Sequence, residues 1–264
     1  MPKIAFIGAG NMGGAIIDGM LKSSDFSSDD IIICEKRPSD ELKSSGIRIA
    51  DLKTAVESAD YVILAVKPNV LGDVLEEIRL CANYEGKTYM SIAAGKTIES
   101  IETILGKVSV VRLMPNICLK AGEGMTVISA SERCSDADIE MAKKIFGSCG
   151  ETLITKEALI DACTAINGSG PAYVFMFAEA MADGAVKHGI DRKSAYLLAF
   201  QTILGSAKLM LESGIAPAVL KDMVCSPGGT TIDAVSALEE WGMKNSVIKA
   251  IDACAKKASE MGKK

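Results

Sequence analysis

A glycine-rich segment close to the N-terminus has the spacing of a loop that binds phosphate groups. It matches the pattern G-x-G-x-x-G, in which the first glycine permits a tight turn, the second lets a pyrophosphate approach the backbone, and the third lets helix and strand pack closely. The segment follows an apolar run at 3–7 and precedes a helical run at 14–21, so a helix N-terminus would face the phosphates. A glycine-rich turn in an unrelated α/β protein is the weaker explanation. We therefore predict a dinucleotide-binding loop made of Gly8, Ala9, Gly10, Asn11, Met12 and Gly13.

The end of the second predicted strand carries opposing signals about the cofactor. Glu35 falls 27 residues after Gly8, roughly where a carboxylate would hydrogen-bond the ribose 2′-OH of NADH. Lys36 and Arg37 follow it and could bind the 2′-phosphate of NADPH, although such pairs usually lie in a solvated turn. We favour NADPH, with NADH as the alternative.

Two further strands end in a proline-containing turn or in small residues at the carboxyl edge of the sheet, where ligands bind in open α/β folds. After the third strand a proline fixes the turn, and Lys67 could direct its ammonium toward a cofactor or a substrate carboxylate, or lie on the surface. After the fourth strand, small residues at 91–95 would let a flat ring approach. That segment and the strand end at 112–116 also fit a purely structural role. These strand ends would present Ala65, Val66, Lys67, Pro68, Ala93 and Ala94 at the edge of the sheet where a ligand binds.

Two glycine-rich segments, 167–173 and 225–231, interrupt the second half of the chain. Each precedes a helical run and would therefore form a helix N-terminus with exposed N–H groups, which favours an anion such as a carboxylate. In the second segment, the hydroxyls of Ser226, Thr230 and Thr231 gather around this N-terminus. Ordinary capping by Ser or Thr is the alternative, but it does not account for the sequence Pro-Gly-Gly followed by two threonines.

Composition excludes several classes of protein. The formal net charge is −5, and the basic residues are scattered, so we expect no nucleic-acid partner. No two of the eight cysteines stand within four residues of each other, so neither a zinc site nor a redox pair is predicted. The N-terminus has no signal-peptide pattern, and no apolar run has the length of a membrane span. We therefore expect a cytoplasmic protein with reduced thiols and no contact with a membrane.

The first half of the chain alternates short runs rich in Ile and Val with helical stretches. Two of the runs, 31–33 and 61–66, are continuously apolar, which indicates burial on both faces. Strands separated by helices form a parallel, doubly wound sheet, because parallel neighbours require crossover connections. The sequence therefore predicts a Rossmann-type α/β domain at 1–155, with strands at 3–7, 31–34, 61–66, 88–92, 109–113 and 125–128.

Residues 156–264 lack strand signals and are predicted to form an all-α domain. The stretch 173–186 is apolar around most of the helix rather than along one stripe, so it needs cover on several sides. A helical domain of this size has little interior of its own. We therefore expect a homodimer in which a second subunit supplies part of the cover; one central helix inside a monomeric bundle is the alternative.

Taken together, these motifs resemble those of the pyrroline-5-carboxylate reductase family, in order and from end to end. The matching segments are G-A-G-N-M-G at 8–13, A-V-K-P at 65–68, R-L-M-P-N at 112–116, G-S-G-P-A-Y at 168–173 and L-K-D-M-V-C-S-P-G-G-T-T at 220–231. The resemblance implies a helical C-terminal domain that interleaves with that of a partner, giving dimers that are often assembled into larger rings. It also implies the last step of proline synthesis, in which NAD(P)H delivers a hydride to the C=N carbon of 1-pyrroline-5-carboxylate.

The residues present agree with reduction of an imine. Ketone reduction requires a proton donor, commonly His or Lys, whereas this chain has one histidine, His188, at a predicted helix end. An imine nitrogen can carry a proton before reduction, so the enzyme mainly has to orient the ring and hold its carboxylate. The resemblance assigns the ring nitrogen to Thr231 and the carboxylate to Ser226, Gly228, Gly229 and Thr230. It also implies that the cofactor is lined by Ala65, Val66, Lys67, Pro68, Ala93 and Ala94. Asn167 stands where the family often has serine.

Two other functions remain open at this point. A 3-hydroxyacid dehydrogenase of similar build would use a lysine on the first long helix of the C-terminal domain, but none lies between Gly168 and Asp183, and Lys187 comes late. A nucleotide-binding regulator without catalysis would normally lose the substrate motif, which is intact here at 226–231.

Overall fold

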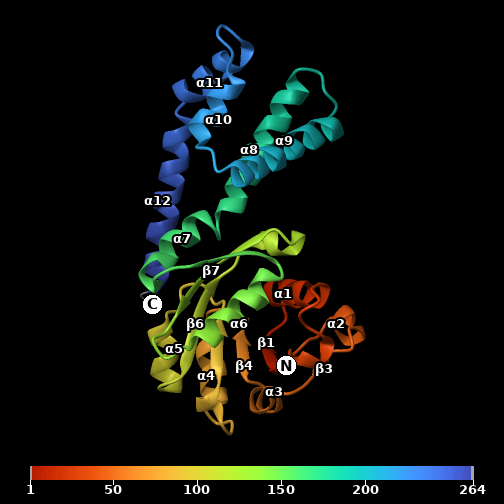
Figure 1. Cartoon of the computed structure of the whole chain (residues 1–264), viewed down its shortest axis with the longest axis vertical. Coiled ribbons are helices and arrows are strands. Elements are labelled where there is room, and N and C mark those ends of the chain that lie inside the picture. The colour runs from red at the N-terminus through yellow and green to blue at the C-terminus, as the bar shows by residue number, and fades with distance from the viewer. Residues whose placement is uncertain (1, 263–264) are drawn as a thin grey trace. The chain divides into compact units, whose positions relative to one another are not determined.

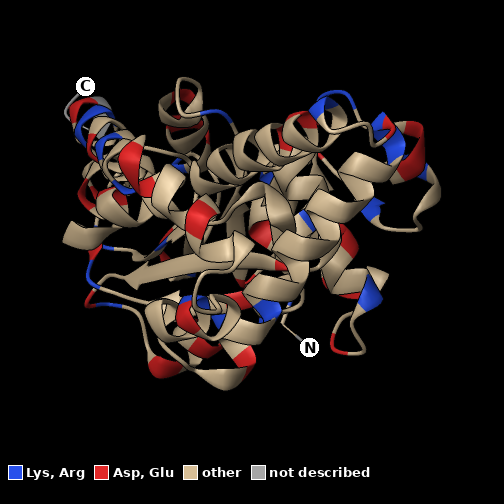
Figure 2. Cartoon of the chain, turned by 90° about the horizontal axis from the view of Figure 1, so that it is seen from above, with Lys and Arg blue, Asp and Glu red and all other residues tan. Residues whose placement is uncertain are grey.

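The structure, a computed structural model, describes residues 2–262. Contacts divide the chain into two compact units. The sheet unit comprises the residues up to Ser169 and those from Cys254 on, and the helical unit comprises Gly170–Ala253. Figure 1 shows the course of the chain with its helices and strands, and Figure 2 marks its Lys, Arg, Asp and Glu residues, which are scattered over the chain.

The sheet unit contains one eight-stranded sheet with the order β3-β2-β1-β4-β5-β6-β7-β8. The chain passes from β1 to β2 on one side and later to β4 on the other, so the direction of winding reverses beside β1. Ligands bind at such a switch point in doubly wound sheets. The strands are β1 Ile4–Ile7, β2 Ile31–Cys34, β3 Arg48–Ile49, β4 Tyr61–Leu64, β5 Thr88–Ser91, β6 Ser109–Met114, β7 Gly124–Ala130 and β8 Gly150–Ile154.

Helices cover both faces of this sheet, because the strands are apolar on both sides. On one face, Phe6 packs with residues of α1 and α6, including Ile16 and Phe146, and all three side chains are fully buried. On the other face, alternate strand residues pack against α3, α4 and α5. These helices are α1 Asn11–Lys22, α2 Asp40–Ser44, α3 Leu52–Ser58, α4 Leu71–Ile78, α5 Ile98–Leu105, α6 Asp136–Gly147 and α7 Ile160–Ile166, with 3-10 turns η1 Ser28–Asp30, η2 Tyr84–Gly86, η3 Ile117–Ala121 and η4 Glu157–Leu159.

The predicted α/β class and the six predicted strands are confirmed, but two features of the sheet differ from the prediction. The prediction of an all-parallel sheet is wrong at β7, which runs antiparallel to β6, since residues 115–123 between them are too few for a parallel crossover. Two edge strands were also missed. β3 has two residues, both exposed, and β8 is largely exposed, so neither has the buried apolar run on which the prediction depended.

The helical unit is built differently. Its helices are α8 Gly170–Lys187, α9 Arg192–Ser213, α10 Pro217–Val224, α11 Thr230–Glu240 and the first part of α12 Met243–Gly262. Helices α8 and α9 pack through small residues spaced four apart, and the buried apolar side chains among its described residues are Ala178, Ala182, Ala195 and Ala199. In contrast, Phe175, Met176, Leu197, Phe200 and Leu211 are more than half exposed.

Helix α9 qualifies the prediction that no apolar run has the length of a membrane span. Among the described residues it is the one helix long and apolar enough to cross a bilayer by length and composition. Little of its apolar stretch is buried inside this chain. Its apolar surface therefore requires a cover that the single chain does not supply.

Candidate dinucleotide and substrate sites

The glycine-rich loop joins β1 to α1 in a conformation that two of its glycines make possible. Gly8 has φ +93°, and a Cβ there would lie 2.8 Å from the Ala65 carbonyl oxygen. A Cβ on Gly13 would lie 2.8 Å from the Gly8 carbonyl oxygen and 3.2 Å from the Ala65 Cβ. Both glycines therefore allow close packing between the loop, helix α1 and the end of β4.

Gly10 is different, because a Cβ there would meet no atom within 4 Å. It is the N-cap of α1 and offers no side chain to the first turn of the helix. The N-terminus of α1 therefore has open space in front of it and N–H groups that no side chain caps. This arrangement fits a pyrophosphate.

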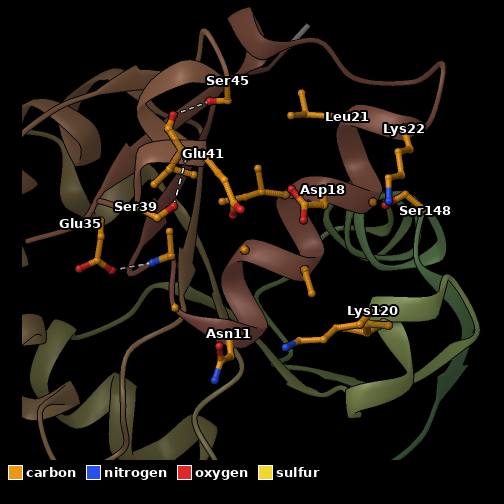
Figure 3. Close-up of a pocket in the computed structure, with 18 of the residues that line it drawn as sticks. Asn11, Asp18, Leu21, Lys22, Glu35, Ser39, Glu41, Ser45, Lys120 and Ser148 are labelled. Atoms are coloured by element: carbon orange, nitrogen blue, oxygen red, sulfur yellow. Dashed lines mark hydrogen bonds between the residues drawn. The ribbon is translucent and has the colours of Figure 1, made fainter. Parts of the chain in front are cut away.

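Glu35 connects the end of β2 to this loop. One carboxylate oxygen accepts the Ala9 N–H at 2.9 Å (Figure 3), and the other accepts the Arg37 N–H at 3.0 Å. Partial burial raises the pKa of Glu35, but backbone hydrogen bonds from Ala9, Arg37 and Lys36 outweigh it and leave the pKa below its usual value. Glu35 is thus an ionised brace of the glycine-rich loop.

A cavity of about 840 Å³ runs along α1 and is lined by parts of the predicted cofactor site. The loop contributes Ala9, Gly10 and Asn11, and the turn after β2 contributes Glu35 and Arg37. Lys36 is not among the lining residues, so the structure separates the two basic residues that the sequence placed together. Gly8, Met12 and Gly13 do not line it either.

Lys120 also lines this cavity, although none of the sequence motifs includes it. It lies on η3, which packs beside α1 through the buried Leu119, and its ammonium points toward Asn11 at the start of that helix (Figure 3). No ion-pair partner of Lys120 is present within residues 2–262. No pattern in the sequence indicates this role, because it depends on how η3 packs against a helix a hundred residues earlier.

The remaining predicted cofactor residues lie at the carboxyl ends of β4 and β5, next to β1. Ala65 follows β4, and its N–H donates to the Ile7 carbonyl oxygen at 2.9 Å, which places the segment 65–68 beside the glycine-rich loop. Lys67 is exposed. Ala93 is buried, and its N–H donates to the Ser91 Oγ at 3.3 Å, whereas Ala94 is exposed at the tip of the turn.

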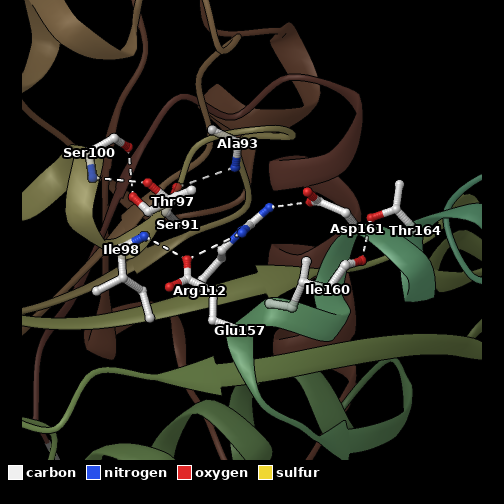
Figure 4. Close-up of polar contacts among 10 residues, drawn as sticks. All are labelled: Ser91, Ala93, Thr97, Ile98, Ser100, Arg112, Glu157, Ile160, Asp161 and Thr164. Carbon is white, nitrogen blue, oxygen red and sulfur yellow. Dashed lines mark hydrogen bonds and ion pairs between the residues drawn. The ribbon is translucent and has the colours of Figure 1, made fainter. Parts of the chain in front are cut away.

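The polar residues of the R-L-M-P-N segment anchor the chain that follows the sheet. The Arg112 side chain is 4% exposed and binds two carboxylates, Glu157 at 3.2 Å and Asp161 at 2.8 Å (Figure 4). Its Nε is buried and has no hydrogen-bond partner, which costs roughly 1–3 kcal/mol. A purely structural role for this segment therefore explains the ion pairs of Arg112 but not its buried, unpartnered Nε.

A second polar cluster explains the unusual Asn167. The Asn116 Nδ2 donates to the Asn167 Oδ1 at 2.9 Å, and the Asn167 Nδ2 donates to the carbonyl oxygens of Met114 at 2.7 Å and Met125 at 3.0 Å. Both asparagines are buried. Asn167 thus satisfies backbone groups of β6 and β7, and its amide supplies both the donor and the acceptor that this position requires.

The predicted substrate loop lies in the helical unit, between α10 and α11. Gly228 has φ +66°, and a Cβ on Gly229 would lie 2.3 Å from the Ser226 Oγ, so the two glycines allow a tight turn against Ser226. The N-cap of α11 is Gly229, and no side chain caps the helix. The alternative of ordinary capping by Ser or Thr is therefore wrong here.

The hydroxyls of this loop have no partners of their own. Within the described part of the chain, the side chains of Ser226, Thr230 and Thr231 make no hydrogen bond. Thr231 is half-buried, while Ser226 and Thr230 are exposed. An uncapped helix N-terminus with three unpartnered hydroxyls is suited to a ligand that carries a carboxylate and a hydrogen-bonding ring atom.

Neither the one histidine nor a metal cluster stands at this loop. Backbone hydrogen bonds at His188 and Gly189 end helix α8, with Gly189 at φ +91°, and the His188 side chain is exposed. Lys187 is the last residue of α8. In residues 2–262 no group of three or more His, Cys, Asp or Glu side chains could hold a metal ion, and all eight cysteines are free.

A doubly wound sheet with an uncapped glycine-rich loop, followed by a separate helical unit, defines a dinucleotide-dependent oxidoreductase of two parts. The family model described as pyrroline-5-carboxylate reductase dimerisation matches residues 157–261, and that of the coenzyme F420-dependent NADP oxidoreductases matches residues 3–95. Among curated proteins, the pyrroline-5-carboxylate reductases of Methanosarcina acetivorans and Escherichia coli are 41% and 40% identical to the chain, each covering 99% of it and 98% of the relative.

Solved structures agree with these relatives. The pyrroline-5-carboxylate reductase of Coxiella burnetii is 33% identical with a TM-score of 0.93, and covers 98% of each chain. The Plasmodium falciparum enzyme, solved with NADP bound, is 30% identical with a TM-score of 0.89, and covers 99% of this chain and 98% of its own. The chain belongs to the pyrroline-5-carboxylate reductase family.

Proposed function

We propose that this chain reduces 1-pyrroline-5-carboxylate to L-proline, the last step of proline biosynthesis, with NADPH as the preferred cofactor. The observation that carries the proposal is the uncapped N-terminus of α11, where the hydroxyls of Ser226, Thr230 and Thr231 have no partner within the described chain. Family membership and the open glycine-rich loop support it.

The substrate residues have separate tasks in this proposal. The carboxylate binds Ser226, Gly228, Gly229 and Thr230, since the N–H groups and positive end of α11 favour an anion. Thr231 hydrogen-bonds the ring nitrogen, which carries a proton before reduction. This contact orients the C=N bond, and no side chain has to move a proton during the reaction.

When bound, NADPH supplies the hydride that adds to the C=N carbon, so imine, NADPH and one proton give proline and NADP⁺. The residues proposed to hold the dinucleotide are those of the loop, the turn after β2, and the ends of β4 and β5. They fit it because α1 is uncapped and a cavity of about 840 Å³ lies alongside. They are Gly8, Ala9, Gly10, Asn11, Met12, Gly13, Lys36, Arg37, Ala65, Val66, Lys67, Pro68, Ala93 and Ala94.

The preference for NADPH rests on the turn after β2. Both carboxylate oxygens of Glu35 already accept backbone N–H groups, whereas Arg37 lines the cavity and can meet a 2′-phosphate. Lys36 would contribute from outside the lining. NADH is then a weaker substitute, because Arg37 would have no phosphate to bind.

We also propose that residues 1–155 act as the dinucleotide-binding domain and 156–264 as the substrate-binding and dimerisation domain. The match of residues 157–261 to a dimerisation family and the exposed apolar side chains of α8 and α9 support a homodimer. In this proposal the dimers can assemble further into a ring, and the enzyme works in the cytoplasm, where its exposed α9 faces protein rather than lipid.

The test is oxidation of NADPH and NADH by the purified protein with racemic pyrroline-5-carboxylate. We expect turnover with both and a higher kcat/KM with NADPH, and no turnover with either would overturn the function. Thr231→Ala should lower kcat while NADPH binding is kept, and Thr231→Ser, which keeps the hydroxyl, is the matched control. A Thr231→Ala enzyme with wild-type kcat would contradict the role of Thr231.

A further inference from the structure

The turn between β5 and α5 is held at both ends by hydrogen bonds from buried or half-buried residues. It contains Ala93 and Ala94, which are proposed above to hold the dinucleotide and whose small side chains would let a flat ring such as nicotinamide approach. At its start the Ser91 Oγ accepts the Ala93 N–H, and at its end the Glu157 Oε1 accepts the Ile98 N–H at 2.8 Å (Figure 4). Glu157 reaches this position from 59 residues further along the chain.

Arg112 fixes the carboxylate that holds the end of this turn. The same Glu157 oxygen that accepts the Ile98 N–H also binds the Arg112 Nη1 at 3.2 Å, and the Arg112 Nη2 binds Asp161 at 2.8 Å. Arg112 also lies directly opposite Ser91 in the pairing of β5 with β6. One buried guanidinium therefore stands beside both tethers of the turn (Figure 4).

Stability alone is a poor explanation of this cluster. The Arg112 side chain is 4% exposed, so its guanidinium has lost most of its hydration, whereas the Glu157 and Asp161 side chains are 31% and 32% exposed and keep part of theirs. Burying one member of an ion pair in this way is often neutral or unfavourable compared with apolar packing. Here the cost is greater, since the Nε of Arg112 is buried without a partner. What the guanidinium does provide is a planar fork that binds two carboxylates at once in a fixed geometry, which a lysine cannot reproduce.

We propose that Arg112 is a positioning residue for the nicotinamide half of the dinucleotide. Through Glu157 it sets where the segment 93–97 stands, and loss of this contact lets the turn move away from the ring. The adenosine half binds at β2, three strands away from β5 in the sheet order, which is about 14 Å at ordinary strand spacing. The inference rests on the dinucleotide site proposed above.

The experiment compares two ligands that share the adenosine half, and it uses Arg112→Lys, which keeps the charge and loses the fork. Titration calorimetry with NADPH should give a Kd raised about tenfold in this variant, because small misplacements at a site weaken binding strongly. The Kd of 2′,5′-ADP, which lacks nicotinamide, should stay within about twofold. Equal weakening of both ligands, or no change in either, would overturn the proposal.

Substitutions of the two carboxylates that bind Arg112 provide a second test, which also stands if Arg112→Lys does not fold. In Glu157→Gln the side chain loses its negative charge, which weakens its pairing with Arg112 at the same oxygen that accepts the Ile98 N–H. Asp161→Asn also weakens the pairing with Arg112, but Asp161 has no hydrogen bond with Ile98. We expect Glu157→Gln to raise the Kd of NADPH more than Asp161→Asn does, with 2′,5′-ADP unaffected by either. The reverse order would contradict the proposed path through Glu157.

A control and an independent readout complete the design. Lys143→Met breaks an exposed ion pair with Glu140 on α6 and should change neither Kd. A wild-type protein that binds NADPH without reducing the imine would overturn the proposed substrate alone, because the Arg112 test measures only dinucleotide binding. In active variants, the KM for NADPH should rise more than kcat falls.

Discussion

The sheet unit and the helical unit bury their apolar residues to very different extents. In the sheet unit, large side chains such as Phe6, Ile16 and Phe146 are fully buried between helices and strands of the same chain. In the helical unit the buried side chains are alanines, while Leu211 is 85% exposed and Phe175 is 62% exposed. The first unit completes its core within one chain. The second leaves most of its large apolar side chains exposed.

The two units also differ in how far their polar side chains find hydrogen-bond partners within the chain. Most buried polar side chains in the sheet unit are hydrogen-bonded within the chain. Asn116 binds Asn167, Asn167 binds backbone carbonyls, and Arg112 binds Glu157 and Asp161, although the Arg112 Nε has no partner. At the 226–231 loop of the helical unit, the hydroxyls have no partner in the described chain. The sheet unit thus satisfies most of its polar groups itself, whereas the helical unit leaves apolar side chains exposed and the hydroxyls of this loop unpartnered, as the proposed dimer and substrate site would require.

The largest effect should come from a charge on the exposed apolar surface of the helical unit. Leu211→Glu would place a carboxylate in the proposed subunit interface, where desolvation disfavours it, so we expect dissociation to monomers and loss of activity of about 100-fold or more. Leu80→Glu is the matched control, since Leu80 is 83% exposed in the sheet unit. Light scattering after size exclusion gives the mass. A Leu211→Glu protein of wild-type mass would contradict the comparison.

The packed glycines of the sheet unit give the next largest effect. Gly13→Ala puts a Cβ 2.8 Å from the Gly8 carbonyl oxygen, so the loop must move, and we expect the Kd of NADPH to rise by about 30-fold or more. Gly72→Ala, at an exposed position of helix α4 where a Cβ would meet no atom within 4 Å, should instead stabilise the protein by up to about 1 kcal/mol. Fluorescence titration and urea unfolding measure the two. Unchanged NADPH binding in Gly13→Ala would show that this glycine is not required.

An intermediate effect is expected at low pH from Glu35. The pKa of Glu35 is lower in the folded protein than in the unfolded chain, so the ionised carboxylate stabilises the fold. This stabilisation is fully present at a pH above the pKa of the unfolded chain and is lost as the pH falls below about 4.5. Glu35→Gln should lower the free energy of unfolding at pH 7 by about 0.5–1 kcal/mol and flatten its decline in acid. Urea unfolding at several pH values measures this. Glu123→Gln, an exposed residue without such bonds, should follow the wild type, and an identical acid decline in Glu35→Gln would exclude the brace.

The smallest effects should come from matched helix caps in the two units. The Ser135 Oγ caps α6 in the sheet unit, and the Asp191 carboxylate caps α9 by accepting the Ser194 N–H at 3.1 Å. Each change to alanine should cost about 0.5 kcal/mol, the lower end of the range for such caps. If α9 folds against a partner, the thermal midpoint of Asp191→Ala should depend on protein concentration more than that of Ser135→Ala. Equal dependence would weaken the contrast between the units.

Local patterns in the sequence were sufficient for the fold class, the six buried strands and the glycine-rich loop. Each of these leaves a mark over a few neighbouring residues, such as an apolar run or a glycine spacing. The antiparallel direction of β7 and the exposed edge strands β3 and β8 left no such mark, because pairing direction and exposure are set by neighbours in the sheet.

The candidate site shows the same division. The turn at 226–231 could be read from its glycines and threonines. The brace between Glu35 and Ala9 joins residues 26 apart, and the pair of Arg112 and Asp161 joins residues 49 apart. Lys120 reaches α1 only through the packing of η3. Such contacts depend on the tertiary structure, so residue types alone could not distinguish a brace from a ligand-binding carboxylate.

The most direct test of the account follows the hydride itself. The purified protein is incubated with pyrroline-5-carboxylate and NADPH carrying deuterium at both C4 positions of the nicotinamide, and the proline formed is analysed by mass spectrometry and NMR. The account predicts L-proline with one deuterium on the ring carbon that was part of the C=N bond. Unlabelled proline, or no proline, would contradict it.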